Sequence, residues 1–252
     1  MITNLVQMSR TKQRLENMKE RKAGRRSAED AEKTKCEIMS IAAKLFCERG
    51  YERVSLRNIS DKAGVSHSLI RHHFGSKEKI WHAISDGLHQ YFEEYLNIII
   101  EHFPKDSTAN EKLYFFTVKV LAHMLVEKQP IQLLADGIRQ DELTDYFIDR
   151  THKVQSTIAT LADDYNQNNP HNQVNIWEVK WLMMIFAQGA SSLEPFMYTT
   201  WEEVKDNPQQ CLLNHWDMFN KMMAFRFNVP SEKILRPERV SDIVHKVPCN
   251  LM

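Results

Sequence analysis

The sequence predicts an all-α protein, and two observations support this fold class. Helix breakers are scarce, because the 252 residues contain only seven glycines and eight prolines. Between the breakers, apolar residues recur three and four positions apart, and no stretch alternates in the manner of a strand. With 42% hydrophobic and 26% charged residues, the composition suits a globular protein of one or two domains. It excludes collagen-like and wholly disordered chains.

The first part of the chain is a basic arm over residues 1–27, which we expect to be flexible. The first clear helical stripe follows it and consists of Ile38, Ile41, Ala42, Leu45 and Phe46. Gly50 ends this helix. Three serines then precede helical segments as N-caps: Ser55, Ser66 and Ser76. The first two segments are short, and the third is long and ends near Pro104.

Further helices are predicted over residues 109–128, 130–140, 142–167, 174–192 and 207–227. The last residues contain three prolines and predict a tail or a docking strap. The expected organisation is an arm (1–27), a helix-turn-helix DNA-binding domain (28–78, motif about 55–74), a helical regulatory and dimerisation domain (79–227) and a tail (228–252).

The formal net charge of zero hides an asymmetry along the chain. Residues 1–80 contain 18 Lys and Arg against 10 Asp and Glu, whereas residues 81–252 contain 15 against 23. A basic N-terminal third joined to an acidic remainder indicates a polyanion-binding module attached to a second domain. The alternative is that these charges only solvate the surface.

Two short helices joined by a tight glycine turn are typical of the helix-turn-helix, whose second helix enters the major groove of DNA. Here Gly64 supplies the turn, and Ile59, Val65 and Ile70 are the expected packing residues. The residues left to face DNA from the second helix are Ser66, His67, Ser68, Arg71 and His72.

The stretch Ile41–Phe46, Gly50–Tyr51, Val54–Leu56, Ile59, Ala63–Ser66 and His73–Glu78 resembles the DNA-binding domain of the TetR (tetracycline-repressor-like) family. The resemblance covers residues 32 to 91. It implies an all-α homodimer that binds palindromic operators, with a variable C-terminal domain that senses a ligand and dimerises.

The resemblance also implies roles for three further residues. Ser55 corresponds to the family's Thr or Ser that caps a helix and touches a phosphate, His73 ends the recognition helix, and Lys77 is aimed at a phosphate. Two departures are Ser68, where glycine is common, and Arg71, where tyrosine is common, so the family's operator rules do not transfer. The basic arm either enters the adjacent minor groove or is a solvated terminus.

Aromatic and methionine side chains are abundant in the second domain. The resemblance implies a cavity among them for a hydrophobic or amphipathic effector, while the alternative for each residue is ordinary core. The candidates are Tyr91, Phe92, Tyr95, Phe115, Phe116, Val120, Met124, Leu134, Ile138, Tyr146 and Phe186.

Two C-terminal helices carry apolar stripes that predict a dimer interface. A four-helix isologous contact would pair each helix with its symmetry mate, and the alternative is a larger intrachain core. The stripes consist of Trp177, Trp181, Met184 and Gln188 on one helix and Leu212, Trp216, Phe219 and Met223 on the other.

The sequence shows no catalytic constellation, phosphate-binding loop or metal motif, so we expect neither an enzyme nor a cofactor. Adjacent His72 and His73 diverge on a helix and make poor joint ligands for one metal ion. The longest charge-free apolar run, Trp181–Leu193, is too short to span a membrane, and the four cysteines lack metal spacing. We expect a cytoplasmic protein.

These observations predict a sequence-specific transcriptional regulator, a ligand-gated homodimeric repressor that binds palindromic double-stranded DNA. The alternative from another class is a dimeric helical interaction protein in which the helix-turn-helix is vestigial.

Overall fold

The computed structural model describes residues 29–137, 139–149 and 152–247. All regular structure in these ranges is helical, which confirms the predicted fold class. The basic arm and Ile138 lie outside the described residues. None of the described helices is long and apolar enough to cross a membrane.

The N-terminal unit contains a helix over residues 29–49, followed by α2 (Leu56–Ala63), α3 (His67–Phe74) and the long α4 (Lys77–Glu101). The larger C-terminal unit contains α5 (Ala109–Val126), α6 (Gln129–Gly137), α7 (Asp141–Asp149), α8 (His152–Asn168), α9 (Ile176–Ser192), α10 (Glu194–Thr200) and α11 (Pro208–Arg226). Short 3-10 helices are η1 (Glu202–Val204), η2 (Ser231–Lys233) and η3 (Val240–Ile243).

Two elements differ from the predicted ones. The single helix expected over residues 142–167 is two helices, α7 and α8. The short α10 was not predicted, because its N-cap is Leu193, which offers no side-chain cap to recognise.

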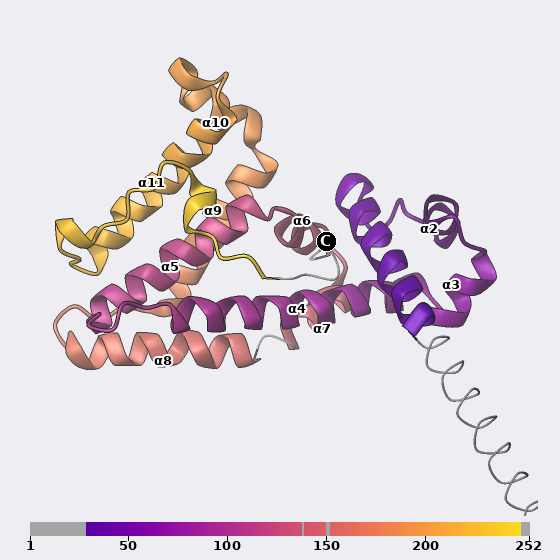
Figure 1. Cartoon of the computed structure of the whole chain (residues 1–252), viewed down its shortest axis with the longest axis horizontal. Coiled ribbons are helices and arrows are strands. Elements are labelled where there is room, and N and C mark those ends of the chain that lie inside the picture. The colour runs from indigo at the N-terminus through magenta and orange to yellow at the C-terminus, as the bar shows by residue number, and fades with distance from the viewer. Residues whose placement is uncertain (1–28, 138, 150–151, 248–252) are drawn as a thin grey trace, which may run out of the picture.

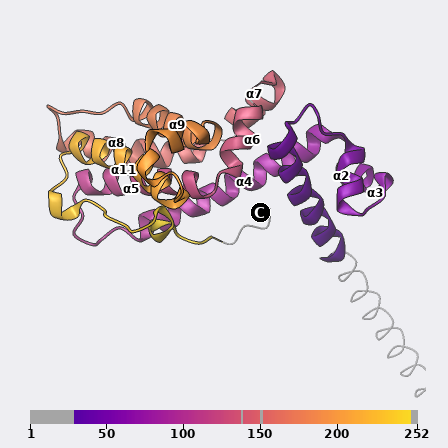
Figure 2. The ribbon, with the colours of Figure 1, turned by 90° about the horizontal axis from the view of Figure 1, so that it is seen from above.

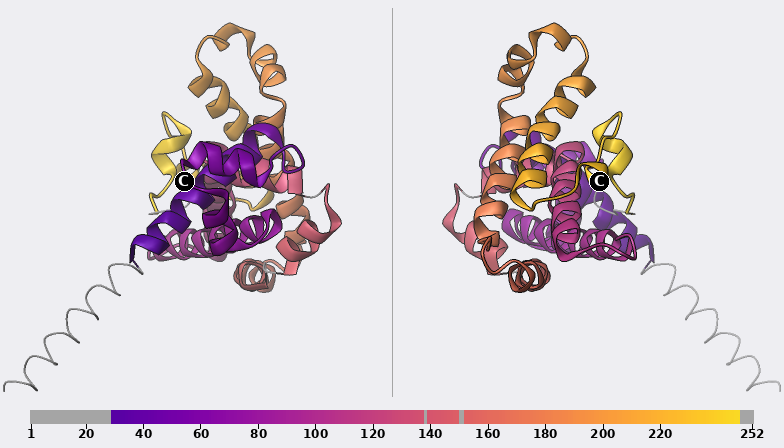
Figure 3. Two further views of the ribbon diagram at one scale, coloured as in Figure 1. Left: turned by 90° about the vertical axis from the view of Figure 1, so that its right-hand side faces the viewer. Right: turned by 90° about the vertical axis from the view of Figure 1, so that its left-hand side faces the viewer.

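The long helix α4 connects the two units, with α2 and α3 near one end and α8 alongside its other half (Figure 1). The helix α5 is the central element of the C-terminal unit, because it packs against α8, α9, α11 and η3 and buries side chains around its whole circumference. The helices α9, α10 and α11 rise away from the layer of α4 and α5 (Figure 3).

The tail after α11 is tied to α5 by hydrogen bonds. The backbone N–H of Leu235 donates to Tyr114 Oη (2.8 Å), which itself donates to Asn220 Oδ1 (2.6 Å). Val240 of η3 is buried in the same core. This segment is therefore a strap across the C-terminal unit up to residue 247.

Candidate nucleic-acid interface

Serine caps and a left-handed glycine build the helix-turn-helix, as the sequence predicts. Ser55 Oγ accepts the backbone N–H of Asn58 (3.2 Å), and Ser66 Oγ accepts that of Leu69 (3.2 Å). Gly64 joins the two helices with φ 65°, a conformation that residues with a Cβ adopt at a cost. These local hydrogen bonds fix where α2 and α3 begin, and the turn at Gly64 joins the two helices.

The two faces of α3 differ in burial. Ile70 and Phe74 are buried against the rest of the unit together with Ile59 of α2, and Val65 is half-buried. The opposite face exposes residues three and four positions apart, which therefore share a side of the helix. The exposed residues are His67, Ser68, Arg71 and His72, with Ser66 exposed at the N-cap.

Three residues predicted to contact DNA also interact with other parts of this chain or are partly covered by it. Ser55 Oγ donates to Asn58 Oδ1 (2.8 Å), so a phosphate must compete with that amide. His73 is half-buried at the end of α3. Lys77 Nζ donates to the backbone O of Tyr51 (3.0 Å) and lies 4.0 Å from the centroid of the Tyr51 ring. Lys77 thus holds the turn that follows the first helix, and two ammonium protons are left for another acceptor.

Sequence reasoning did not select Arg57 on α2. Its side chain is 87% exposed, and its Nε lies 3.9 Å from Asp61 Oδ2. The first helix of a helix-turn-helix crosses the DNA backbone, so an exposed arginine there is a candidate phosphate contact. The position of Arg57 in the first helix of the motif could have identified it from the sequence.

Comparisons with known proteins agree with this geometry. Residues 38–84 match the model of the family described as bacterial regulatory proteins, tetR family. The HTH-type transcriptional regulator TtgR of Pseudomonas putida is 36% identical over 66 residues, which are 26% of this chain and 31% of TtgR. The chain carries a tetR-family DNA-binding domain.

A second relative is the HTH-type transcriptional repressor KstR2 of Mycobacterium tuberculosis, 37% identical over 75 residues, which are 29% of this chain and 34% of KstR2. The chain therefore matches about a third of the length of these relatives. The solved structure of the ketosteroid transcriptional regulator KstR2 of Mycobacterium tuberculosis has a TM-score of 0.55 at 15% identity and covers 77% of this chain and 93% of its own.

The fold also resembles that of FadR from Bacillus subtilis in complex with stearoyl-CoA. That structure has a TM-score of 0.52 at 16% identity and covers 71% of this chain and 96% of its own. At these identities the likeness to solved structures concerns the fold alone.

Helix α6 joins the tetR-type domain to the C-terminal unit. The Asp136 carboxylate accepts the backbone N–H of Tyr51, whose carbonyl holds Lys77. Cys47 Sγ donates to the backbone O of Gln129 at the start of α6 (3.6 Å). Burial, with the charges of Asp136 and Glu48 as smaller causes, raises the pKa of the Cys47 thiol to about 12, so this thiol is protonated at neutral pH.

Apolar packing reinforces this joint. Leu133 of α6 and Leu143 of α7 are buried in the core of the tetR-type domain. Gly137 lies against Trp81 of α4, where a Cβ would come 2.9 Å from Trp81 Cζ2. Seen from above, α6 and α7 lie beside α4 and the first helix (Figure 2). Segments assigned by sequence to the second domain thus complete the core of the first.

A cavity of about 70 Å³ lies among α4, α5, α8 and α9. Four residues predicted for an effector site line it: Phe92, Phe116, Val120 and Met124. The other side is formed by Ile158 of α8 and by Ile176, Lys180, Met183 and Met184 of α9. Met184, predicted to face a partner chain, also lines this cavity.

A buried histidine lies on α5 next to the cavity residues Val120 and Met124. His123 Nε2 is 2.8 Å from Tyr91 Oη, and Tyr95 lies over the His123 ring at 3.9 Å between centroids. Burial lowers the pKa of His123 to about 4, so the ring is neutral at neutral pH. Tyr91 and Tyr95 therefore serve a polar contact between α4 and α5.

The remaining effector candidates have other surroundings. Tyr146 Oη donates to Asp86 Oδ1 (2.9 Å), and its ring stacks on His82 at 3.8 Å. Phe186 packs against Phe219. Phe115 is buried in the core and Leu134 is half-buried on α6.

The dimer prediction needs a correction for α11. Trp216, Phe219 and Met223 are buried within this chain, and Leu212 packs against the same core. The apolar stripe that the sequence shows on α11 is therefore the inner face of this helix, which packs against α5 and α9. Trp216 Nε1 donates to the backbone O of Val118 (2.9 Å), which confirms the inward orientation.

A second apolar face on α9 and α11 remains exposed. Trp177 and Trp181 of α9 are 46% and 66% exposed, and Phe225 of α11 is 90% exposed. The exposed set also includes Ile185, Met218 and Met222. Gln188 is half-buried on α9.

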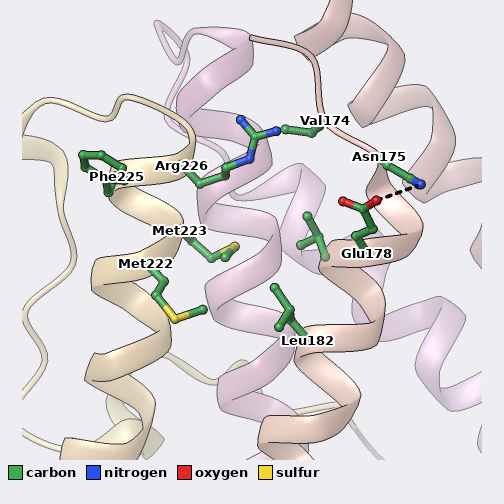
Figure 4. Close-up of a pocket in the computed structure, with 9 residues that line it drawn as sticks. Val174, Asn175, Glu178, Leu182, Met222, Met223, Phe225 and Arg226 are labelled. Carbon is green, nitrogen blue, oxygen red and sulfur yellow. Dashed lines mark hydrogen bonds between the residues drawn. The ribbon is translucent and has the colours of Figure 1, made fainter.

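A groove of about 270 Å³ lies between α9 and α11, and of the exposed set only Met222 and Phe225 line it. Leu182 of α9 and Met222 of α11 point toward it, while Phe225 points away at the edge of α11 (Figure 4). Exposed apolar area of this kind marks an interaction surface. Among the described residues, no three His, Cys, Asp or Glu side chains are close enough together to hold a metal ion.

Proposed function

We propose that the protein is a sequence-specific DNA-binding transcriptional regulator that acts as a ligand-gated homodimeric repressor. The observation that carries this proposal is the tetR-type helix-turn-helix, in which α3 exposes His67, Ser68, Arg71 and His72 on one side. In such a motif the second helix enters the major groove, where an arginine can bond guanine through two hydrogen bonds.

Dimerisation follows from the geometry of DNA recognition. Two recognition helices bind half-sites one DNA turn apart, about 34 Å or a multiple of it, and a two-fold protein matches a palindrome. We assign the dimer contact to the exposed face of Trp177, Trp181, Ile185, Met218, Met222 and Phe225. In this proposal the exposed face takes the place of the α11 residues that the sequence suggested for the dimer interface, because those residues are buried within the chain.

The effector site is the cavity among α4, α5, α8 and α9. Two helices lead from its walls to the DNA-binding domain: α4 directly, and α6 after α5. A ligand that binds one orientation of these helices more tightly changes the spacing of the α3 pair, and only this difference in affinity can shift the equilibrium. The FadR structure was solved with stearoyl-CoA, which supports a ligand with an aliphatic part in this fold.

The test is selection of bound genomic DNA fragments by the purified full-length protein at several salt concentrations. We expect a palindromic site, with affinity that falls as salt rises. Arg71→Ala should relax the preference at one base pair, whereas Arg236→Ala, an exposed residue of the strap, is a matched control without effect. Sequence-blind binding by the wild type would favour the dimeric interaction protein with a vestigial helix-turn-helix.

A second variant separates two roles of Lys77. If Lys77 contacts a phosphate, Lys77→Ala weakens binding to all sequences alike and lowers the slope of log affinity against log salt by about one unit. If Lys77 acts through Tyr51, affinity falls while the slope stays unchanged.

A further inference from the structure

The end of the strap, residues 244–247, docks on α4 and α5 through a histidine. The rings of His245 and of His102, the residue at the C-terminal end of α4, lie 4.6 Å apart between centroids. The backbone N–H of His245 is directed at the phenol of Tyr95 on α4, whose hydroxyl donates to the backbone O of Lys119 on α5 (3.3 Å). We call residues 244–247 the strap end.

The strap before residue 244 is held by contacts of its own. Val240 of η3 is buried in the core of the C-terminal unit, and the backbone N–H of Leu235 is hydrogen-bonded to α5. At the strap end itself, Val244 and Val247 are only half-buried against the same core. The strap end can therefore leave its site while the strap before it stays attached.

The docked His245 lacks an acceptor for a second ring proton. Its Nε2 atom is buried and has no hydrogen-bond partner among the described residues. Burial lowers the pKa of His245, and the charges of Lys119 and His102 lower it further. The other titratable neighbours are Tyr95, whose pKa is raised by burial, and Lys246, which follows in sequence. No carboxylate of the described residues contributes to the pKa of His245, so a protonated ring would meet positive charges without a counter-ion.

We propose that the strap end is an acid-released latch: protonation of His245 detaches residues 244–247 from α4 and α5, and deprotonation docks them again. Detachment removes a contact from α4, the helix that leads to the DNA-binding domain (Figure 1). The latch is a property of the folded chain and needs neither DNA nor an effector.

Acid favours the detached state because His245 is more basic there. In water a histidine has a pKa of about 6.5, and docking lowers that value. Above this pH the ring is neutral in both states, and the strap end stays docked. Below about pH 6.5 the detached strap end takes up a proton that the docked one does not, so the ratio of detached to docked molecules rises by up to about tenfold per pH unit.

The test measures NMR order parameters of the backbone amides of residues 244–247 in the full-length protein, from about pH 7.5 down to about pH 5. We expect values near about 0.85 at the highest pH and a decrease toward about 0.6 or less as the pH falls. His245→Phe keeps an aromatic ring against His102 but cannot take up a proton, so its strap end should stay ordered throughout. Lys119→Met removes a neighbouring charge and should shift the transition to lower pH. His171→Phe, at an exposed histidine between α8 and α9, is the matched control and should behave as the wild type.

Three results decide the proposal. A loss of order in the wild type that is absent from His245→Phe supports it. A strap end that stays ordered down to the lowest pH, or an equal loss of order in His245→Phe, overturns it. A loss of order that also includes the amides of α5, such as that of Val118, overturns it as well, because acid then loosens the whole unit and not a latch.

Discussion

Asp136→Ala tests the joint between α6 and the DNA-binding domain. In the native protein the Asp136 carboxylate accepts the backbone N–H of Tyr51, which lies 85 positions away in sequence. Alanine removes this acceptor and leaves the N–H of a half-buried residue without its partner. We therefore expect the turn at residues 50–53 to loosen and the hydrogen bond from Lys77 Nζ to the backbone O of Tyr51 to weaken.

The magnitude follows from the partial burial of the pair. A hydrogen bond to a charged group is worth about 1.5–3 kcal/mol when buried. Both residues are half-exposed, so we expect a loss of about 1–2 kcal/mol of unfolding free energy after solvent screening. For a chain of this size, such a loss lowers the melting temperature by about 2–8 °C.

The assay combines thermal unfolding with hydrogen exchange at the Tyr51 amide, which reports the lost bond directly. Asp136→Asn, which keeps a carbonyl oxygen as acceptor, should lie between the wild type and Asp136→Ala. Asp145→Ala removes an exposed carboxylate of α7 and is the control. An Asp136→Ala protein with wild-type melting and an equally protected Tyr51 amide would show that this contact does not hold the joint.

Three further predictions follow from burial and packing. If the proposed dimer forms through the exposed apolar residues, Trp181→Glu should convert it to a monomer in sedimentation experiments, because this side chain is 66% exposed in the single chain; a variant that stays dimeric would remove Trp181 from the interface. The pKa of His123 is about 4 when folded against 6.5 ordinarily, so below about pH 6.5 the unfolded chain takes up a proton that the folded one does not. Stability should thus fall by about 3 kcal/mol as the pH drops from about 7.5 to 4, and urea titrations of His123→Gln should lack this component; an equal pH dependence in both proteins would contradict it. Gly137→Ala should cost about 1 kcal/mol net in urea titrations, since overpacking against Trp81 outweighs the gain in helix propensity; unchanged stability would mean that α6 shifts freely.

The helix-turn-helix could be predicted from sequence because its structure is local. The caps at Ser55 and Ser66 bond to backbone N–H groups three residues ahead, and the turn depends on Gly64 itself. The exposed face of α3 then follows from helical periodicity, since Ile70 and Phe74 must point inward.

The C-terminal unit could be predicted only in part. Apolar spacing and the family resemblance selected Phe92, Phe116, Val120 and Met124, which line one cavity. The same reasoning misassigned Trp216, because an apolar stripe shows that a face is covered but not whether the chain itself or a partner covers it. The central helix α5 is buried on all sides, and its own sequence does not say which neighbours surround it.

The sequence alone determined the helical fold class, most of the helices and the local geometry of the DNA-binding motif. It could do so because caps, turns and helical periodicity depend on residues within one or two turns of each other. Only the tertiary structure decided that α6 and α7 complete the core of the N-terminal domain, that Asp136 holds Tyr51, and that side chains of α4, α5, α8 and α9 meet at one apolar cavity. These features depend on contacts between residues distant in sequence, and no local pattern of a single chain encodes which distant partners will meet.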